Sequence, residues 1–286
     1  MGVNYWLIQT FNGISYGALL FLVGSGLSLI FGVMRIVNLA HGSYFLLGGY
    51  VALTVIWSTG SWVLAIPLAA IAIGAVGLVM ERAFLRPLGF DPLRQVLLTV
   101  GFAFLFQQAA LDIWTGNNFD IDPPAALAQS VRVGSLYLPL YRIFMIAIAV
   151  VIGGALWLAM EKTRIGAMVR ATVDDAQMAR GVGIDTSRIS MFIFALGAAL
   201  AGLGGVIGGA FLGIYPGLDF EILPLAFAVV IIGGMGSLGG AAIGALLVGL
   251  ADNFGKALFP EVSYFTLYAP MALILAVKPT GLFGRE

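Results

Sequence analysis

Long apolar stretches alternate along the chain with short clusters of charged residues. A helix needs about 20 apolar residues to cross a bilayer, and about eight stretches with little or no charge fit this requirement. They run from Tyr5 to Val33, Leu39 to Trp57, Trp62 to Met80, Gln95 to Leu111, Pro139 to Met160, Ile189 to Gly213, Ile222 to Ala251 and Val262 to Val277. Membrane β-strands would instead alternate in polarity over about ten residues. The pattern therefore predicts an all-α, polytopic transmembrane helical bundle.

The basic residues between these stretches predict the orientation, because Lys and Arg accumulate on the cytoplasmic side. One basic loop carries Arg82, Arg86 and Arg94, and a second covers residues 161–188. Two stretches separate these loops, so both lie on the same side. The opposite loops are mainly acidic. We therefore expect the N-terminus outside and the tail with Lys278 and Arg285 inside.

This orientation requires an odd number of crossings, although eight stretches are present. The seventh is interrupted by the glycine-rich sequence 233–240, which a straight helix would carry only at a cost. Two halves of about 14 residues would each reach only about 21 Å. A re-entrant hairpin and two short crossings both fit, and we expect seven full crossings plus one broken element.

The composition excludes several classes of protein. The chain has 60% hydrophobic and 10% charged residues, whereas a soluble domain has about 25% charged residues. It has no cysteine, one histidine and a net charge of zero, which argues against metal binding and nucleic-acid binding. No phosphate-binding loop occurs, so no cofactor is expected on this chain. Without a linker or a cleavable leader, residues 1–286 are expected to form a single membrane domain.

Two interruptions of the apolar pattern are candidates for a transport pathway, because irregular backbone inside a membrane normally lines a cavity or is buried in protein. The first surrounds the only histidine, and the second is the glycine-rich break. The candidate pathway residues are Asn38, His41, Gly42, Ser43, Gly233, Gly234, Gly236 and Ser237. Purely structural roles are the alternative: Arg35 at the cytoplasmic interface, and His41 bonded to a backbone carbonyl.

The inside loop 161–188 has the pattern of one or two short amphipathic helices. Met168, Val169, Ala171, Met178, Ala179 and Val182 form its apolar face. Docking onto another protein would use this face, and lying on the membrane surface is the alternative. The residues expected at the docking contact are Arg164, Arg170, Asp174, Asp175, Gln177, Ala179 and Gly183. Asp185 or Thr186 is expected to cap the following helix.

Taken together, these elements resemble the permease family of branched-chain amino acid ABC importers, the LivH type. The matching segments are the run from Gly26 to Gly42 that contains Asn-Leu-Ala-His-Gly, Thr163-Arg164-Ile165-Gly166 through Gly183-Ile184, Gly233-Gly234-Met235-Gly236-Ser237, and Lys278 through Gly284. They occur in the family's order and cover almost the whole chain. The family's coupling segment usually carries Glu-Ala-Ala followed by a glycine. Here Gln177-Met178-Ala179 precedes Gly183, so the acidic position is lost.

The resemblance implies a set of partners in a bacterial inner membrane. These are a second, non-identical permease, two cytoplasmic ATPase subunits that bind ATP and Mg, and a periplasmic substrate-binding protein. The expected function is transport of a small amino acid, branched-chain in the first instance, by ATP-driven alternating access without catalysis on this chain. Because relatives move urea and amides, the solute itself does not follow from the resemblance.

A self-sufficient channel or a secondary carrier for a small polar solute such as urea or an amide is the alternative. An ion-coupled carrier generally needs a carboxylate inside the membrane. Every Asp and Glu of this chain is expected at the end of a stretch or in a loop, which argues against this alternative. A membrane enzyme is disfavoured because no acid, base or metal-binding residues converge within the stretches.

Overall fold

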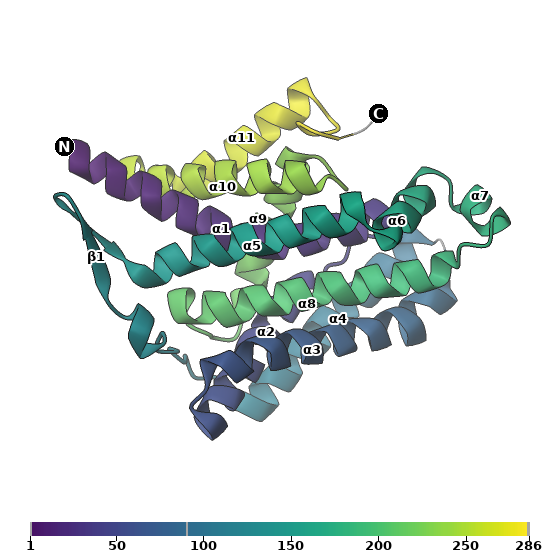
Figure 1. The fold of residues 1–286 in the computed structure, drawn as a ribbon, viewed down its shortest axis with the longest axis horizontal. Helices are drawn as coiled ribbons and strands as arrows, with labels where there is room; N and C mark the ends of the chain where they lie inside the picture. Colours follow the sequence, from purple (N-terminus) through teal and green to yellow (C-terminus); the bar gives the residue numbers. More distant parts are fainter. Residues whose placement is uncertain (1, 90, 285–286) are drawn as a thin grey trace.

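The computed structural model describes residues 2–89 and 91–284, with the backbone alone at positions 263, 264, 266 and 267. Eleven α-helices and one β-hairpin make up the regular structure of these residues, together with short 3₁₀ and π turns (Figure 1). The helices are α1 (Val3–Met34), α2 (His41–Thr59), α3 (Trp62–Met80), α4 (Pro92–Trp114), α5 (Leu140–Lys162), α6 (Arg164–Asp174), α7 (Ala176–Gly181), α8 (Thr186–Leu212), α9 (Leu218–Gly233), α10 (Leu238–Leu258) and α11 (Ser263–Val277). Strands β1 (Ser130–Val133) and β2 (Leu136–Pro139) pair antiparallel.

All eight predicted stretches are helical, which confirms the predicted fold class. Six helices of the described chain are long and apolar enough to cross a membrane: α1, α3 with the turns that follow it, α4, α5, α8 and α10. The predicted seventh stretch is divided into α9 and α10, which pack together. The prediction of two equal halves was wrong, because α9 has 16 residues and α10 has 21. At 1.5 Å per residue, α10 reaches about 32 Å and can span a bilayer.

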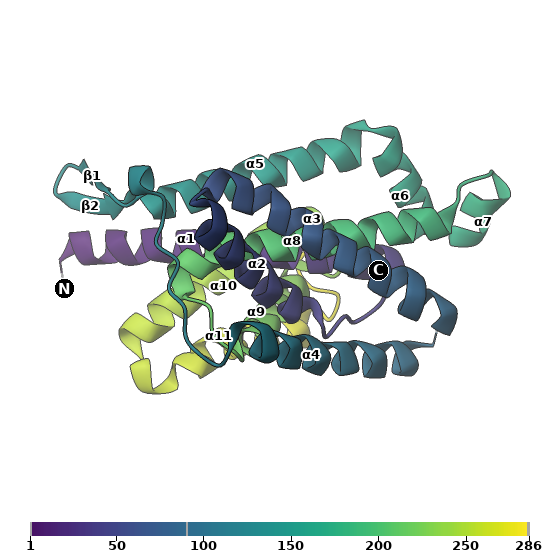
Figure 2. The ribbon, with the colours of Figure 1, turned by 90° about the horizontal axis from the view of Figure 1, so that it is seen from below.

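The two ends of the molecule differ in structure and charge. The N-terminus lies beside the β-hairpin, where the Asn4 side chain donates a hydrogen bond to Ser135 Oγ over 3.1 Å. Helices α6 and α7 project from the opposite end (Figures 1 and 2). That end also carries the arginines of the turn between α3 and α4. The basic loops therefore share one end, as predicted, whereas Arg285 lies outside the described residues.

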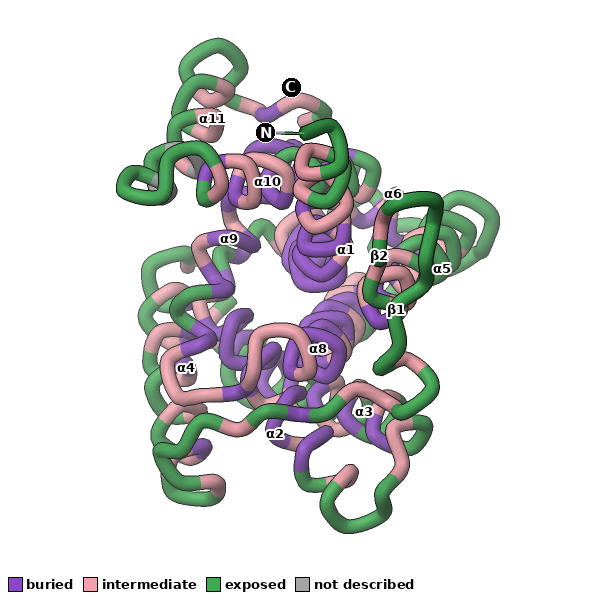
Figure 3. The backbone as a smooth tube through the Cα atoms, turned by 90° about the vertical axis from the view of Figure 1, so that its left-hand side faces the viewer, coloured by how far each residue is buried: buried purple, intermediate pink, exposed green. Residues whose placement is uncertain are grey.

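Helices α1 and α8 form the centre of the bundle, and α3, α4, α5 and α11 are more exposed around it (Figure 3). Small residues allow the central helices to approach closely. A Cβ atom on Gly26 would lie 2.5 Å from the carbonyl oxygen of Gly197, and one on Gly205 would lie 1.9 Å from that of Phe45. Backbones therefore touch where α1 and α2 cross α8, and any side chain there would force the helices apart.

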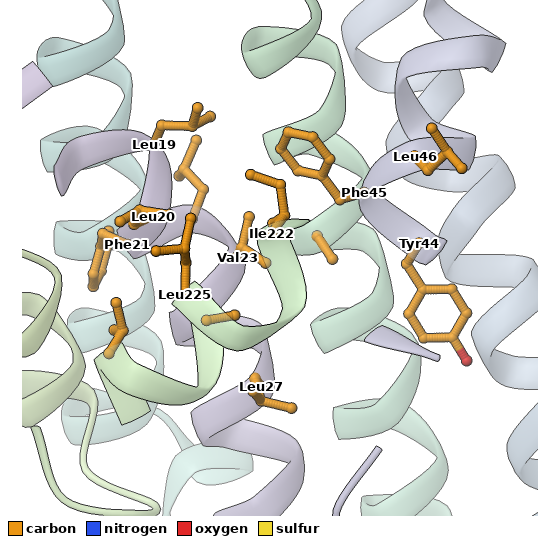
Figure 4. Packing of buried hydrophobic residues seen from close by; sticks show 14 of the residues in the cluster. Leu19, Leu20, Phe21, Val23, Leu27, Tyr44, Phe45, Leu46, Ile222 and Leu225 are labelled. Atoms are coloured by element: carbon orange, nitrogen blue, oxygen red, sulfur yellow. The ribbon is translucent and has the colours of Figure 1, made fainter. Parts of the chain in front are cut away.

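The largest apolar cluster joins α1, α2 and α9. Figure 4 shows Ile222 and Leu225 of α9 among Leu20 and Val23 of α1, with Phe45 of α2 nearby. All five side chains are buried. A short helix such as α9 is held by this contact, since burying each large apolar side chain contributes about 1.5–3 kcal/mol in globular proteins.

Polar side chains determine where several helices begin. Ser61, Asp91, Thr163, Asp185 and Ser237 each accept a hydrogen bond from a backbone N–H in the first turn that follows. Such N-caps satisfy donors that the helix itself leaves unpaired. Of the two candidates for the start of α8, Asp185 is the cap, because its Oδ1 accepts from the Arg188 N–H over 3.1 Å.

Candidate functional site

The first candidate pathway segment connects α1 to α2. Helix α1 ends at Arg35, which is exposed and has a left-handed backbone at φ 54°. The chain then runs back into the bundle, and α2 begins at His41 beside Val23 of α1. Val23 lies 11 residues before Met34, which corresponds to about 16 Å along a helix. Helix α2 therefore begins within the bundle.

Asn38 and Thr99 occupy the backbone donors at the start of α2. The Asn38 side-chain oxygen accepts from the Ala40 N–H over 3.1 Å, and its carbonyl accepts from the His41 N–H over 3.3 Å. The Leu39 N–H donates to Thr99 Oγ1 over 3.2 Å. These three N–H groups are thus engaged within the chain and are unavailable to a solute in this conformation.

His41 is fully buried and bonded to the middle of α1. Its Nε2 lies 2.9 Å from the carbonyl oxygen of Val23, so Nε2 is the nitrogen that carries the proton. The imidazole also packs edge-on against the Tyr44 ring. This hydrogen bond links the start of α2 to the middle of α1. It is the structural role that the sequence offered as the alternative for His41.

A carboxylate lies next to Ser43, where none was expected. Ser43 Oγ donates to Asp219 Oδ2 over 3.0 Å, and Asp219 is only 2% exposed. Glu81 and Asp252 are also buried. Asp219 and Glu81 lie at helix ends, as expected, but their burial was not foreseen, and Asp252 lies inside α10 just past the end of the predicted stretch. The connector before Asp219 contains glycines and a proline, so the local sequence resembles a surface loop. In the structure, α9 begins at Leu218 inside the protein, and Asp219 is therefore buried.

Two helix N-termini meet at this carboxylate. Asp219 lies in the first turn of α9 and is bonded to Ser43 in the first turn of α2. The backbones touch, because a Cβ on Gly42 would lie 2.3 Å from the Asp219 carbonyl oxygen. Helix N-termini carry partial positive charge. The Asp219 carboxylate therefore stabilises two ends that would otherwise repel each other.

The second candidate segment is the tight turn between α9 and α10. Gly234 and Gly236 have φ values of 101° and 81°, which side-chain-bearing residues rarely adopt. A Cβ on Gly236 would lie 2.9 Å from Gly32 Cα of α1. Ser237 caps α10 through its hydroxyl and accepts from Ser28 Oγ through its carbonyl, over 3.3 Å. The turn is therefore fastened to the inner end of α1.

The C-terminal segment closes over the same turn. The backbone N–H of Leu282 donates to the Ile232 carbonyl over 2.9 Å, and that of Phe283 donates to the Gly233 carbonyl over 3.0 Å. Gly233 in turn packs against Gly240 within the hairpin, where a Cβ would lie 2.2 Å from the Gly240 carbonyl oxygen. The carbonyls at the end of α9 are thus satisfied by backbone.

The two candidate segments are not brought into one site. The start of α2 contacts α1 at Val23, and the α9–α10 turn contacts it at Gly32. Nine residues separate these positions, or about 14 Å along a helix. Asn38, His41, Gly42 and Ser43 form one group with Asp219, and Gly233 to Ser237 form another. Their role in a pathway remains a prediction, and each group has a defined structural role.

The inside loop forms a helical hairpin of α6 and α7 between α5 and α8. Val169 is buried in an apolar cluster with Leu29 and Ile193, which anchors α6 to α1 and α8. The Arg170 guanidinium bonds the Met160 carbonyl oxygen. Asp175 accepts from the N–H groups of Gln177 and Met178 and thereby starts α7. Four of the six residues of the predicted apolar face are thus buried or half-buried.

The remaining two residues of that face are exposed at the tip of the hairpin. Met178 is 70% exposed and Val182 is 77% exposed, whereas Ala179 is 3% exposed. Gly183 has a left-handed backbone at φ 90° and closes α7 with an N–H bond to the Arg180 carbonyl. Ala179 therefore faces its own chain and Gly183 shapes the turn. Met178 and Val182, which the predicted docking set omitted, are the exposed apolar side chains.

The remaining predicted docking residues divide in the same way. Arg164, Asp174 and Gln177 are exposed, whereas Arg170 and Asp175 form intrachain hydrogen bonds. Across the described residues, no three His, Cys, Asp or Glu side chains gather closely enough to hold a metal ion.

The fold and these features define a class: a multi-pass α-helical membrane transport protein with helices that begin inside the bundle and an amphipathic hairpin at its basic end. A family model described as the permease component of branched-chain amino acid transport systems matches residues 9–275. The chain belongs to this family, which confirms the resemblance found in the sequence.

Several curated relatives align over nearly the whole chain. The high-affinity branched-chain amino acid transport system permease protein LivH of Salmonella typhimurium is 30% identical over 98% of this chain and 96% of its own length. BraD of Pseudomonas aeruginosa, named as the same kind of permease, is 26% identical over 99% and 97%. LivM of Salmonella typhimurium is 26% identical over 91% of this chain and 67% of its own length. No solved structure matches the chain.

Proposed function

We propose that this chain is one permease subunit of an ABC importer in a bacterial inner membrane. The transported solute is a small amino acid, branched-chain in the first instance, which enters the cytoplasm by ATP-driven alternating access. The family match over residues 9–275 carries this proposal. The names of relatives that align from end to end support the choice of solute.

The proposed complex contains a second, non-identical permease. The chain aligns with LivH over 96% of that protein and with LivM over 67%, so it is of the LivH kind. A partner of the LivM kind would complete the membrane part. A periplasmic binding protein would deliver the amino acid, and selectivity would reside mainly there.

The α6–α7 hairpin is the proposed contact with a cytoplasmic ATPase, which would bind ATP and Mg. Met178 and Val182 present exposed apolar surface at the end where basic residues gather. Arg164, Asp174 and Gln177 surround this surface and would supply the polar rim that protein interfaces typically have. Closure of the ATPases would then move α5 and α8, to which the hairpin is joined.

The helix break at Asn38 to Ser43 and the turn at Gly233 to Ser237 are the proposed moving parts of the pathway. Both contain hydrogen bonds that can be exchanged without unfolding a whole helix, such as those of Ser43 and Ser28. The inward-facing and outward-facing states would differ in these contacts.

An ion-coupled carrier is the competing function, and the buried Asp219 is the observation that favours it. Its carboxyl group, however, is bonded to Ser43 and lies at two helix N-termini, so a structural role accounts for it. The test is [¹⁴C]leucine uptake by proteoliposomes that contain this chain alone or with its partner chains. If the chain is an importer subunit, uptake should occur only in the complete complex, with ATP on the side of the membrane that carries the ATPase subunits. Uptake by this chain alone, driven by an ion gradient, would establish the carrier instead.

A further inference from the structure

A cavity of about 350 Å³ lies near the end of the bundle that carries the β-hairpin. It is enclosed by α1, the end of α8, the α8–α9 connector, α9, α10 and α11. This volume falls within the range of small-molecule sites, about 300–1,000 Å³. The cavity is on the outer side in the predicted orientation, and none of the pathway residues predicted from the sequence lines it.

Charges of both signs line this cavity. Lys256 Nζ lies 2.7 Å from Asp252 Oδ2 and 5.7 Å from the centre of the Tyr16 ring. Glu221 accepts a hydrogen bond from the Tyr215 hydroxyl over 2.9 Å. Charged side chains within membrane segments are costly unless they face water or one another. Three of them around one cavity therefore indicate that water enters it.

Apolar side chains form the rest of the wall. Leu218, Ile222 and Leu225 lie along one face of α9, and Leu212 lies at the end of α8. The lining thus combines charge with apolar surface: Glu221, Asp252 and Lys256 provide two anions and one cation, and the leucines and isoleucine provide aliphatic side chains. A zwitterion with an aliphatic side chain has the complementary pattern.

We propose that this cavity binds an amino-acid zwitterion on its way into the importer, an inference that rests on the proposed function. The α-carboxylate would pair with Lys256, and the α-ammonium group would pair with Glu221 and Asp252. The aliphatic side chain would contact Leu218 and Ile222. A bound amino acid would displace water, and ion pairs strengthen when water is excluded. Without a bound amino acid, the pair between Asp252 and Lys256 neutralises two of the three charges in the cavity.

The test uses Leu212→Cys as a reporter, because the chain has no cysteine of its own. The complex is assembled in nanodiscs with cysteine-free partners and treated with a small thiol reagent. Three compounds are compared as protectants: leucine, leucinol, which lacks the carboxylate, and 4-methylpentanoate, which lacks the ammonium group. Ser130→Cys, on the exposed strand β1 that contributes no residue to the cavity lining, is the control reporter and should not be protected.

We expect leucine to protect at concentrations at least tenfold below those of both analogues, since one charge-assisted contact is worth about tenfold or more. Lys256→Met should raise the half-protecting concentration of leucine about tenfold and leave that of leucinol unchanged. Glu221→Gln should also raise the half-protecting concentration of leucine about tenfold, and it should leave that of 4-methylpentanoate unchanged. Arg132→Met and Glu261→Gln remove a positive and a negative charge at exposed outer residues and should have no effect.

The proposal would be overturned if the three compounds protected Leu212→Cys at equal concentrations, or if none of them protected it. This comparison needs only the Leu212→Cys protein, so it tests the proposal even if the charge variants do not fold. ATP-driven leucine uptake by the same complex is measured separately in liposomes. Uptake without protection would refute this site and leave the importer intact. Protection without uptake would support the site and refute the importer.

Discussion

The helix break inside the bundle and the hairpin at its basic end were both predicted to be functional regions. They differ in how far their side chains are buried and bonded within the chain. At the break, Asn38, His41 and Ser43 are buried and bonded within the chain. At the hairpin tip, Met178 in the short helix α7 and Val182 at its end are exposed. The side chains at the break are thus held by contacts within the chain, whereas the apolar side chains at the tip face outward.

This difference separates two kinds of functional residue. Residues at the break hold helix ends in place, so their substitution should affect stability before transport. Residues at the tip contribute almost nothing to the fold, so their substitution should affect only what the tip binds.

Gly42→Val should prevent correct folding. The new Cβ would lie 2.3 Å from the Asp219 carbonyl oxygen, and the backbones of α2 and α9 would have to separate. Overpacking of a buried site costs about 1–3 kcal/mol, and more where backbone must move. Size-exclusion chromatography in mild detergent should show loss of the monodisperse protein. Gly154→Val in α5, where no atom lies within 4 Å of the new Cβ, should keep it.

Asp219→Ala should lower the free energy of unfolding by about 2–4 kcal/mol. It removes the acceptor of Ser43, worth about 1–3 kcal/mol, and an anion at two helix N-termini, worth up to about 2 kcal/mol. Asp219→Asn keeps an acceptor and should cost less. Thermal unfolding in detergent measures both, with the exposed Asp112→Ala as control. Equal stability of the Asp219→Ala and wild-type proteins would contradict the structural role of this carboxylate.

Met178→Ala and Val182→Ala should change the free energy of unfolding by no more than about 0.5 kcal/mol, because exposed side chains contribute little to the fold. The matched interior change is Val169→Ala, which opens a cavity between α6, α1 and α8. It should cost about 1–2 kcal/mol more than either tip variant. Comparable losses at the tip and at Val169 would mean that the tip packs against this chain.

The sequence was sufficient for the helices and their order because apolar length is the dominant signal in a membrane. It also located the glycine turn, since only glycine adopts the φ values of Gly234 and Gly236 without strain. It could not place Asp219, because the burial of that residue depends on contact with Ser43, 176 positions away. Nor could periodicity divide the hairpin's apolar face into Val169, which packs inward, and Met178, which points outward.

In the proposed importer, the hairpin tip couples this chain to an ATPase. The most direct test places one substitution at the two ends of the molecule: Val182→Glu at the tip and Val262→Glu at the opposite end, both on exposed valines. Leucine uptake and substrate-stimulated ATP hydrolysis are measured together in the reconstituted complex. A charge buried in the contact would cost on the order of 2–5 kcal/mol, so both rates should fall at least tenfold for Val182→Glu and stay near wild type for Val262→Glu. Unchanged coupling in Val182→Glu would contradict the claim.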